Sequence, residues 1–109
     1  MSKYIVNPEQ SSHHEIFPGV HIHTVAGQQL MLSLVEFAPH SVVQLHSHPH
    51  EQMGVLLEGE LTFVIGDEKH VVRPGQMWRI PGGVSHSATA GSERVRALDV
   101  FHPVREDYR

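Results

Sequence analysis

The sequence contains no cysteine among its 109 residues. Disulfide bonds and thiolate metal ligands are therefore excluded, and because this usage suits a reducing compartment, we expect a cytoplasmic protein. A closed structural zinc site commonly relies on cysteine thiolates. A metal centre in this chain therefore has to use other ligands.

Long apolar runs and clusters of positive charge are also missing. No segment approaches the roughly 18 consecutive apolar residues of a membrane span, and the N-terminal stretch lacks the basic start and apolar run of a secretory signal. The 8 lysines and arginines are scattered, and the net charge is −4. We therefore expect neither a membrane nor a nucleic acid as a partner.

The pattern along the chain predicts one all-β domain over residues 1–109. A domain of this length buries one core, whose stability is modest without a metal or a partner subunit. Residues 1–19 are expected to form an irregular arm with a short strand at Tyr4–Val6, residues 20–103 a barrel with the functional site, and residues 104–109 a tail. Strands are predicted over 20–24, 30–37, 42–48, 53–57, 61–65, 69–72, 77–80 and 95–101. Short strands separated by turns, such as the hairpin signal Gly66–Asp67, indicate a sandwich or a small barrel.

Histidine is unusually frequent, with 11 residues in the chain. His46 and His48 are two positions apart on a predicted strand and so face the same way, and Gln52 keeps that parity if Pro49 leaves the register unchanged. Together with His86 from a distant segment, these side chains would bind one metal ion, since imidazole suits Zn, Cu, Fe and Ni. On spacing alone, a solvated histidine pair on a strand is the alternative.

The other histidines are expected to have different roles. His21 and His23 repeat the local spacing without a third ligand nearby, so we expect them at the surface or at a dimer interface. His13–His14 fall in the arm and are expected to be solvated. His50 shares the inward parity, and we keep it as a candidate pocket residue.

The spacing around the first histidines resembles the first sequence motif of the cupin superfamily. In that motif five residues separate a glycine from His-X-His, and an acidic ligand and a second glycine follow at fixed distances. His46, His48, Gln52 and Gly59 fall on these positions, and His40 stands in place of the leading glycine.

The second cupin motif is matched further along the chain. Gly75, Pro81, Gly83 and His86 have its spacing, and Ala90 replaces its final asparagine. The resemblance covers residues 40–90. It implies a single-domain cupin, a small jelly-roll β-barrel, with one metal ion held by His46, His48, Gln52 and His86.

Gln52 stands where many cupins carry a glutamate. A neutral amide oxygen leaves the metal site one charge more positive than a carboxylate would. It also donates less electron density to the metal. This counts against activation of O₂ and favours a Lewis acid that binds hydroxyl or carboxylate oxygens. The adjacent Glu51 is the alternative ligand, although its parity places it on the other face of the strand.

The last predicted strand carries a carboxylate among apolar residues. Asp99 shares its face with Val95, Ala97 and Phe101, where an ionised group is costly unless it is paired or used. It is therefore a candidate general base, and the alternative is a surface aspartate on an edge strand. Arg105 could bind a substrate carboxylate as a bidentate fork, and its alternative is a solvated charge in the tail.

The whole chain is similar to the KdgF family, small single-domain cupins of pectin and alginate breakdown, through residues 46–52, 78–86 and 99–105. The similarity implies a metal-dependent enzyme that converts 4,5-unsaturated monouronates, left by polysaccharide lyases, to linear 4-deoxy-5-keto uronate. It implies catalytic roles for Asp99, Phe101, Arg105 and Gln52. We expect Arg105 to bind the substrate carboxylate and Phe101, with Trp78, to form an apolar wall. The metal would be Ni, Zn, Fe, Mn or Co.

Two other functions remain open at this point. One is a non-catalytic cupin that binds a sugar acid, and the other is a metal-dependent dioxygenase or a sugar isomerase. Gln52 argues against the dioxygenase, and the lack of a basic cluster beyond Arg79, Arg94 and Arg96 argues against a sugar-phosphate isomerase. Because small cupins tend to pair through sheet edges, we also expect a homodimer.

Overall fold

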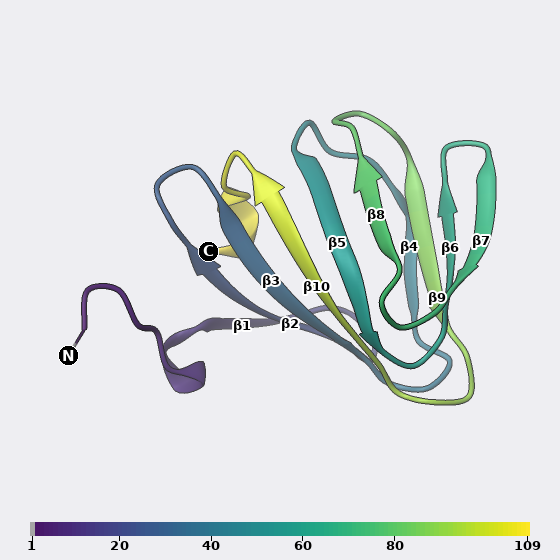
Figure 1. The fold of residues 1–109 in the computed structure, drawn as a ribbon, viewed down its shortest axis with the longest axis horizontal. Helices are drawn as coiled ribbons and strands as arrows, with labels where there is room; N and C mark the ends of the chain where they lie inside the picture. Colours follow the sequence, from purple (N-terminus) through teal and green to yellow (C-terminus); the bar gives the residue numbers. More distant parts are fainter. Residues whose placement is uncertain (1) are drawn as a thin grey trace.

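The computed structural model describes residues 2–109, which form ten strands and two short 3-10 helices (Figure 1). In chain order these elements are η1 (Pro8–Gln10), β1 (Ser12–Phe17), β2 (Val20–Ala26), β3 (Met31–Phe37), β4 (Val42–His46), β5 (Glu51–Glu58), β6 (Leu61–Ile65), β7 (Glu68–Val72), β8 (Met77–Ile80), β9 (His86–Ala90), β10 (Val95–His102) and η2 (Glu106–Tyr108).

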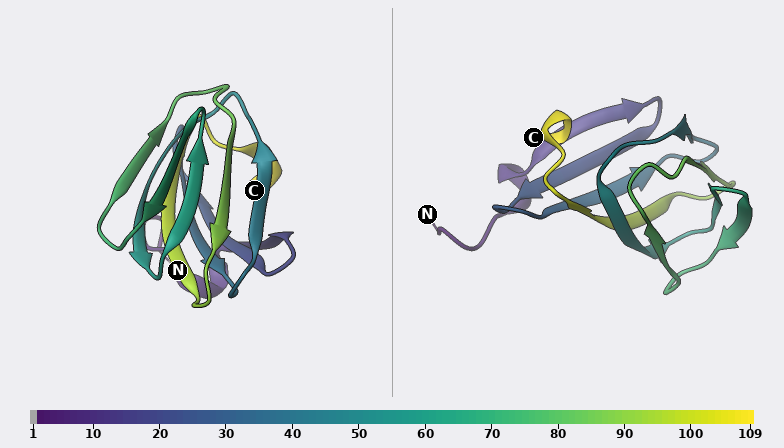
Figure 2. Two further views of the ribbon diagram at one scale, coloured as in Figure 1. Left: turned by 90° about the vertical axis from the view of Figure 1, so that its right-hand side faces the viewer. Right: turned by 90° about the horizontal axis from the view of Figure 1, so that it is seen from above.

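The strands form two antiparallel sheets. The six-stranded sheet has the order β1-β2-β3-β10-β5-β8, and the four-stranded sheet has the order β4-β9-β6-β7. Seen from above, the strands from β4 to β9 curl into a barrel at one end of the molecule, while β1 and β2 extend from the other end (Figure 2). This architecture is the all-β jelly-roll that the sequence predicted.

Side-chain alternation explains how the sheets enclose a core. Every second residue of β10 is buried, namely Val95, Ala97, Asp99 and Phe101. The paired strand β3 has the same period, so the two strands present one continuous wall to the interior. The apolar core that they help to line includes Leu56, Leu61, Phe63, Trp78 and Ile80.

The predicted hairpin after β6 is confirmed. Ile65 pairs with Glu68, so Gly66 and Asp67 form the whole connection between β6 and β7. The φ angle of Gly66 is 60°, which is the left-handed conformation that such two-residue turns need.

The expectation of an irregular arm over residues 1–19 is wrong for its second half. Residues 12–17 form β1, which pairs with β2 at the edge of the larger sheet, whereas Tyr4–Val6 is not a strand. The strand is hard to recognise because its sequence is polar, and only Ile16 and Phe17 pack against the core. Pairing with β2 therefore decides the structure of this segment more than its own hydrophobicity does.

The prediction for residues 42–48 was too long, and β9 was not predicted at all. β4 ends at His46, and its register with β9 shifts between Val43 and His46. This irregularity turns Leu45 out to solvent and brings His46 inward. His48 lies beyond the strand, so simple alternation along one strand is not the reason that the two histidines meet.

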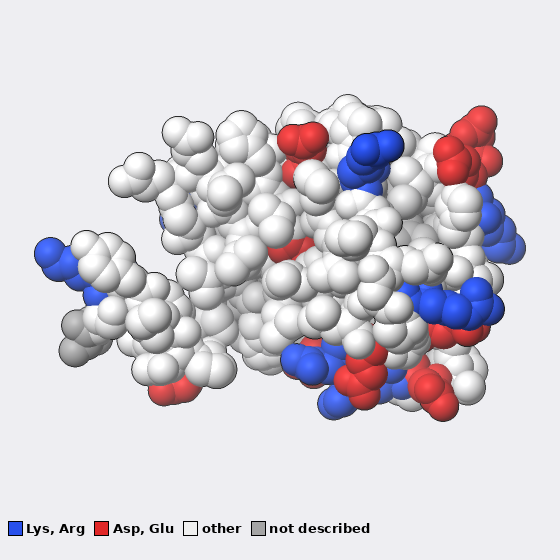
Figure 3. All heavy atoms as spheres, viewed as in Figure 1, with Lys and Arg blue, Asp and Glu red and all other residues white. Residues whose placement is uncertain are grey.

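Charge is unevenly distributed over the surface. In Figure 3, acidic and basic side chains alternate near β6 and β7, while the surface over β3 and β10 is largely uncharged. Several apolar side chains of the larger sheet are exposed, including Leu32, Met53, Leu57 and Met77. Within residues 2–109, no helix has the length and apolar character needed to cross a membrane.

Candidate active site

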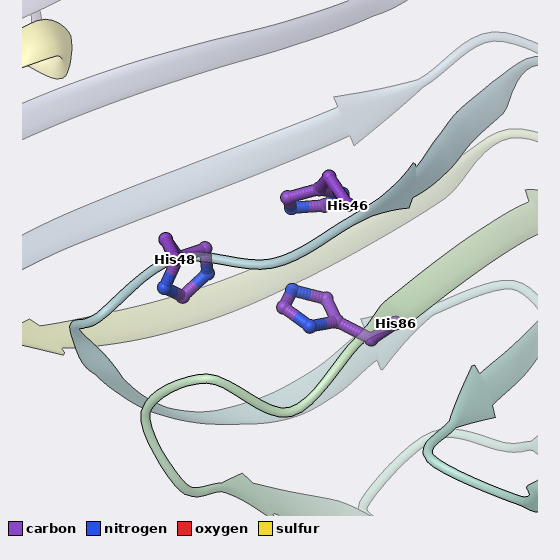
Figure 4. A group of neighbouring side chains, drawn as sticks. All are labelled: His46, His48 and His86. Carbon is purple, nitrogen blue, oxygen red and sulfur yellow. The ribbon is translucent and has the colours of Figure 1, made fainter.

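Three histidine side chains converge at the junction between the two sheets (Figure 4). His46 comes from the end of β4, His48 from the following loop and His86 from the start of β9. One ring nitrogen of each lies within 4.8 Å of those of the other two, which is the spacing of ligands around one metal ion. His48 and His86 are buried, and His46 is half-buried.

Main-chain carbonyl groups fix the orientation of all three rings. The Nδ1 atom of His46 lies 2.8 Å from the carbonyl oxygen of Gln44, that of His48 lies 3.0 Å from His50, and that of His86 lies 2.9 Å from Val84. A carbonyl oxygen only accepts hydrogen bonds, so each Nδ1 carries the proton and each Nε2 presents a lone pair.

The Nε2 atom of His86 gives the strongest support for a metal site. It is buried and has no hydrogen-bond partner among residues 2–109. A buried nitrogen with a lone pair is costly when nothing pairs with it. The three imidazoles therefore fit a divalent metal ion, which would take up these lone pairs.

Gln52 supplies a fourth donor to the same position. Its Oε1 atom lies 3.0 Å from Nε2 of His48. Because both atoms present lone pairs when Nδ1 of His48 is protonated, this pair has the arrangement of two ligands of one cation. Glu51, the alternative ligand, is exposed on the opposite face of β5.

Two loops hold His48 in place. The backbone N–H of Gly83 donates to the carbonyl oxygen of His48 at 2.8 Å. A Cβ atom on Gly82 would clash with the carbonyl oxygen of Pro49, so glycine is required where the loops meet. The loop after β8 thus positions a ligand that comes from the loop after β4.

Asp99 lies in the interior, 8% exposed, and its side chain is held from two directions. Nε1 of Trp78 donates to its Oδ1 at 2.8 Å, and the amide of Gln52 also hydrogen-bonds to the carboxylate. Gly54 stands between Asp99 and Trp78 in the sheet, and a Cβ atom there would clash with both. The contact between indole and carboxylate therefore requires a glycine at this position.

Burial dominates the ionisation of the site. It raises the pKa of Asp99 to about 6, although the hydrogen bonds of Gln52 and Trp78 and the charge of Arg105 all act in the opposite direction. Burial lowers the pKa of His86 to about 4, and it also lowers the pKa of His48, with a further contribution from Arg105. His48 and His86 are therefore neutral near pH 7, as metal binding requires.

The C-terminal residues fold back over the same interior. Arg105 is 8% exposed, and its guanidinium carbon lies 3.8 Å from the ring centroid of Tyr108 and 5.2 Å from that of Phe101. Asp107 bonds to the Nε and Nη2 atoms of Arg105 at 3.4 and 3.0 Å. The idea of a solvated tail charge is therefore wrong, since aromatic rings and an ion pair hold this side chain in place.

One cavity brings these groups together. It comprises about 520 Å³ of space, including its open mouth, and lies between the sheets. Of the residues predicted from the sequence, it is lined by His46, Gln52, Trp78, His86, Asp99, Phe101 and Arg105. His48 adjoins it through its contacts with Gln52 and with the ring of Phe101.

The sequence reasoning missed three residues of this region. Ser33 and Tyr108 line the cavity, and Gly54 makes room for the bond between Trp78 and Asp99. The isolated glycine within a predicted strand was the only available signal, because such a glycine often marks a close approach. Ser33 and Tyr108 carry no comparable signal.

The remaining histidines lie away from the cavity. His13, His21 and His23 gather on the outer face of β1 and β2, where Nε2 of His13 lies 2.9 Å from Nδ1 of His21. They are exposed or half-exposed, in agreement with a surface position. His50 is half-buried and contributes its carbonyl oxygen to His48, and it does not line the cavity.

Comparison with known proteins decides the family, because residues 33–101 match the cupin domain family. The chain belongs to the cupins. The cupin motifs predicted from the sequence lie within this match, around the four side chains that fit a metal ion.

Two curated proteins are similar to this cupin. It is 31% identical over 71 residues to the dimethylsulfoniopropionate lyase DddW of Ruegeria pomeroyi, and the alignment covers 65% of this chain and 47% of DddW. The chain thus spans about half the length of DddW. This cupin is also 28% identical over 80 residues to the pectin degradation protein KdgF of Dickeya dadantii, and that alignment covers 72% of this chain and 73% of KdgF.

The structure of KdgF from a Halomonas species is also similar. Its TM-score to this cupin is 0.84 at 25% sequence identity, and the alignment covers 98% of each chain. The resemblance to KdgF therefore extends over nearly the full described fold.

Proposed function

We propose that this cupin opens the ring of 4,5-unsaturated monouronates to give linear 4-deoxy-5-keto uronate. The observation that carries the proposal is one cavity that brings His46, His86 and Gln52, with His48 adjoining, beside a buried carboxylate and a buried guanidinium. The similarity to two KdgF proteins, one of them named for pectin degradation, supports the choice of substrate.

The proposed reaction is an isomerisation that needs one proton removed and one proton added. The substrate is a cyclic hemiacetal whose ring oxygen is also part of an enol ether. Removal of the proton from the anomeric hydroxyl forms the C1 carbonyl and breaks the bond between C1 and the ring oxygen. The electron pair forms the C5 carbonyl, and the former double bond takes a proton at C4. Addition of water across the double bond is an alternative first step.

Asp99 is the proposed proton carrier. Only one carboxylate is needed, because the proton taken from the anomeric hydroxyl can be returned at C4. The bonds from Trp78 and Gln52 hold this carboxylate in one orientation within the cavity. We assign the general-base and general-acid roles to Asp99 on this basis.

Arg105 is the proposed partner of the substrate carboxylate. Asp107 accepts hydrogen bonds from Nε and Nη2 of Arg105, and a substrate carboxylate would pair with the guanidinium from the side that carries Nη1. The ring of Phe101 packs against the guanidinium of Arg105. Phe101 would also contact the sugar ring, and Trp78 would extend this apolar wall of the cavity.

His46, His48, Gln52 and His86 would hold one divalent metal ion. When bound, it supplies Lewis acidity that favours negative charge on a substrate oxygen. The residues themselves fix the donor set, which suits Ni, Zn, Fe, Mn or Co. Metal analysis of the purified protein identifies the ion.

An ultraviolet assay tests the proposal. Wild-type protein should abolish the absorbance of the unsaturated monouronate, and a chelator should prevent this. Asp99→Asn should reduce turnover about 100-fold or more with metal still bound. A metal-loaded Asp99→Asn protein with the wild-type rate would refute the role of Asp99.

The same preparation distinguishes the other functions. A wild-type protein that binds uronates without turnover would be a sugar-acid-binding cupin. Oxygen uptake would indicate a dioxygenase, and cleavage of dimethylsulfoniopropionate, the substrate that the name of DddW contains, would indicate a lyase. Each of these results would overturn the ring-opening proposal.

We also propose that the protein is a cytoplasmic homodimer that pairs through the larger sheet. Leu32, Met53 and Met77 are about half or more exposed on the outer face of this sheet, and the surface over β3 and β10 is largely uncharged (Figure 3). Light scattering at micromolar concentration should give twice the mass of the chain. A monomer, or a dimer that survives Leu32→Glu with Met53→Glu, would contradict this interface.

A further inference from the structure

A buried hydroxyl group in the cavity has no assigned role. Ser33 is 1% exposed on β3, and its Oγ atom has no hydrogen-bond partner among residues 2–109. An unpaired buried hydroxyl destabilises the fold, whereas alanine at the same position would not. Its presence beside the candidate active site therefore points to a ligand contact.

The neighbours of Ser33 in the sheet already have partners. Ser33 lies directly opposite Asp99 on one side and opposite Thr24 on the other. Asp99 bonds to Trp78, and Oγ1 of Thr24 donates to the carbonyl oxygen of Tyr108 at 2.7 Å. Of these three cross-strand neighbours, Ser33 is the one whose polar group has no partner among residues 2–109, so its hydroxyl can bond a ligand in the cavity.

Ser33 also has the position that a substrate contact needs. It lines the same cavity as Asp99, Arg105, His46 and His86. The carboxylate of a sugar acid would be taken by Arg105 and its anomeric hydroxyl by Asp99. A serine hydroxyl both donates and accepts, so it is matched to a further hydroxyl of the sugar.

We propose that Oγ of Ser33 hydrogen-bonds a ring hydroxyl of the sugar-acid substrate, close to its anomeric carbon, and thereby contributes to specificity. This inference rests on the proposed function. A site built to bond a hydroxyl discriminates against compounds that lack it, because its own polar group is then left unpaired.

Substitution of Ser33 should separate activity from stability. Ser33→Ala and the nearly isosteric Ser33→Cys should each lower kcat/KM for the unsaturated monouronate about tenfold, because one hydrogen bond is lost. The melting temperature of Ser33→Ala should equal or exceed that of the wild type. Folded variants with the wild-type kcat/KM would overturn the proposal and indicate that the hydroxyl binds only an ordered water.

Ser41 provides a matched control. It is also a buried serine, but its Oγ donates to the carbonyl oxygen of Ala38 at 2.7 Å, and it does not line the cavity. Ser41→Ala should lower the melting temperature and leave kcat/KM unchanged. The two serines should therefore give opposite results in the two measurements.

A binding experiment separates this inference from the proposed function. If the wild type does not turn over the unsaturated uronate, the proposed function fails, and the stabilisation of wild type and Ser33→Ala by galacturonate decides the role of Ser33. Stabilisation of the wild type that is lost in Ser33→Ala supports the contact. Equal stabilisation of both, or none of either, overturns it.

Discussion

The indole of Trp78 reaches the carboxylate of Asp99 by passing over Gly54. The three residues stand in one row on β8, β5 and β10, and the bond from Nε1 to Oδ1 is 2.8 Å long. A side chain at the central position would occupy the space that both groups use. The orientation of the proposed proton carrier thus depends on a residue without a side chain.

Gly54→Ala should impair the site. Its Cβ atom would clash with Asp99 and Trp78, so the bond between them breaks. We expect kcat/KM to fall at least tenfold and the free energy of unfolding to fall by about 1–3 kcal/mol, as for other overpacked sites. Gly91→Ala is the control, because a Cβ atom there meets nothing within 4 Å. Wild-type activity in Gly54→Ala would contradict the argument.

Trp78→Phe should change the pH dependence of the reaction. Burial raises the pKa of Asp99 to about 6, and the bond from Trp78 counteracts this effect. Without the indole N–H, the pKa of Asp99 should rise further. The acidic limb of the kcat/KM profile, which requires the ionised carboxylate, should move up by roughly half to one pH unit. An unmoved limb, or one at lower pH, would show that Trp78 does not act through Asp99.

Asp99→Asn should stabilise the metal-free protein in a pH-dependent manner. The pKa of Asp99 is raised from 3.8 to about 6 on folding, so the carboxyl group increasingly destabilises the folded state as the pH rises through this window. At pH 7.5 the amide variant should be more stable by on the order of 2–3 kcal/mol, and the difference should shrink at pH 4.5. Urea unfolding in chelator measures both values, and a pH-independent difference would be inconsistent with the burial of this charge.

Asp107→Asn should weaken substrate binding. Asp107 holds one edge of the Arg105 guanidinium, and its own side chain is 62% exposed, so the stability of the fold should change little. We expect KM to rise roughly two- to fivefold with kcat nearly unchanged, since an exposed ion pair is weak. Glu106→Gln, which removes the exposed ion pair with Arg109, is the control. Equal KM values for both variants and the wild type would exclude a positioning role for Asp107.

The sequence was informative where one strand or one motif sufficed. Alternation along β10 placed Asp99 and Phe101 on one face, the resemblance to KdgF favoured the inward direction for that face, and the cupin spacing predicted the residues that converge at the junction of the sheets. The sequence did not predict features that depend on a neighbouring strand. β1 is a strand because β2 pairs with it, and the roles of Gly54 and Ser33 follow from which residues stand opposite them. Cross-strand register cannot be read from a single chain.

The four candidate ligands come from different parts of the barrel, and this has a mechanical consequence. His46 and His86 belong to strands of the four-stranded sheet, whereas Gln52 belongs to the six-stranded sheet. An ion held by all of them would tie the two layers together at one end of the barrel. Because the chain has no cysteine, this metal coordination would take the place of a disulfide cross-link between the sheets. The same four side chains would then serve both the chemistry of the site and the stability of the fold.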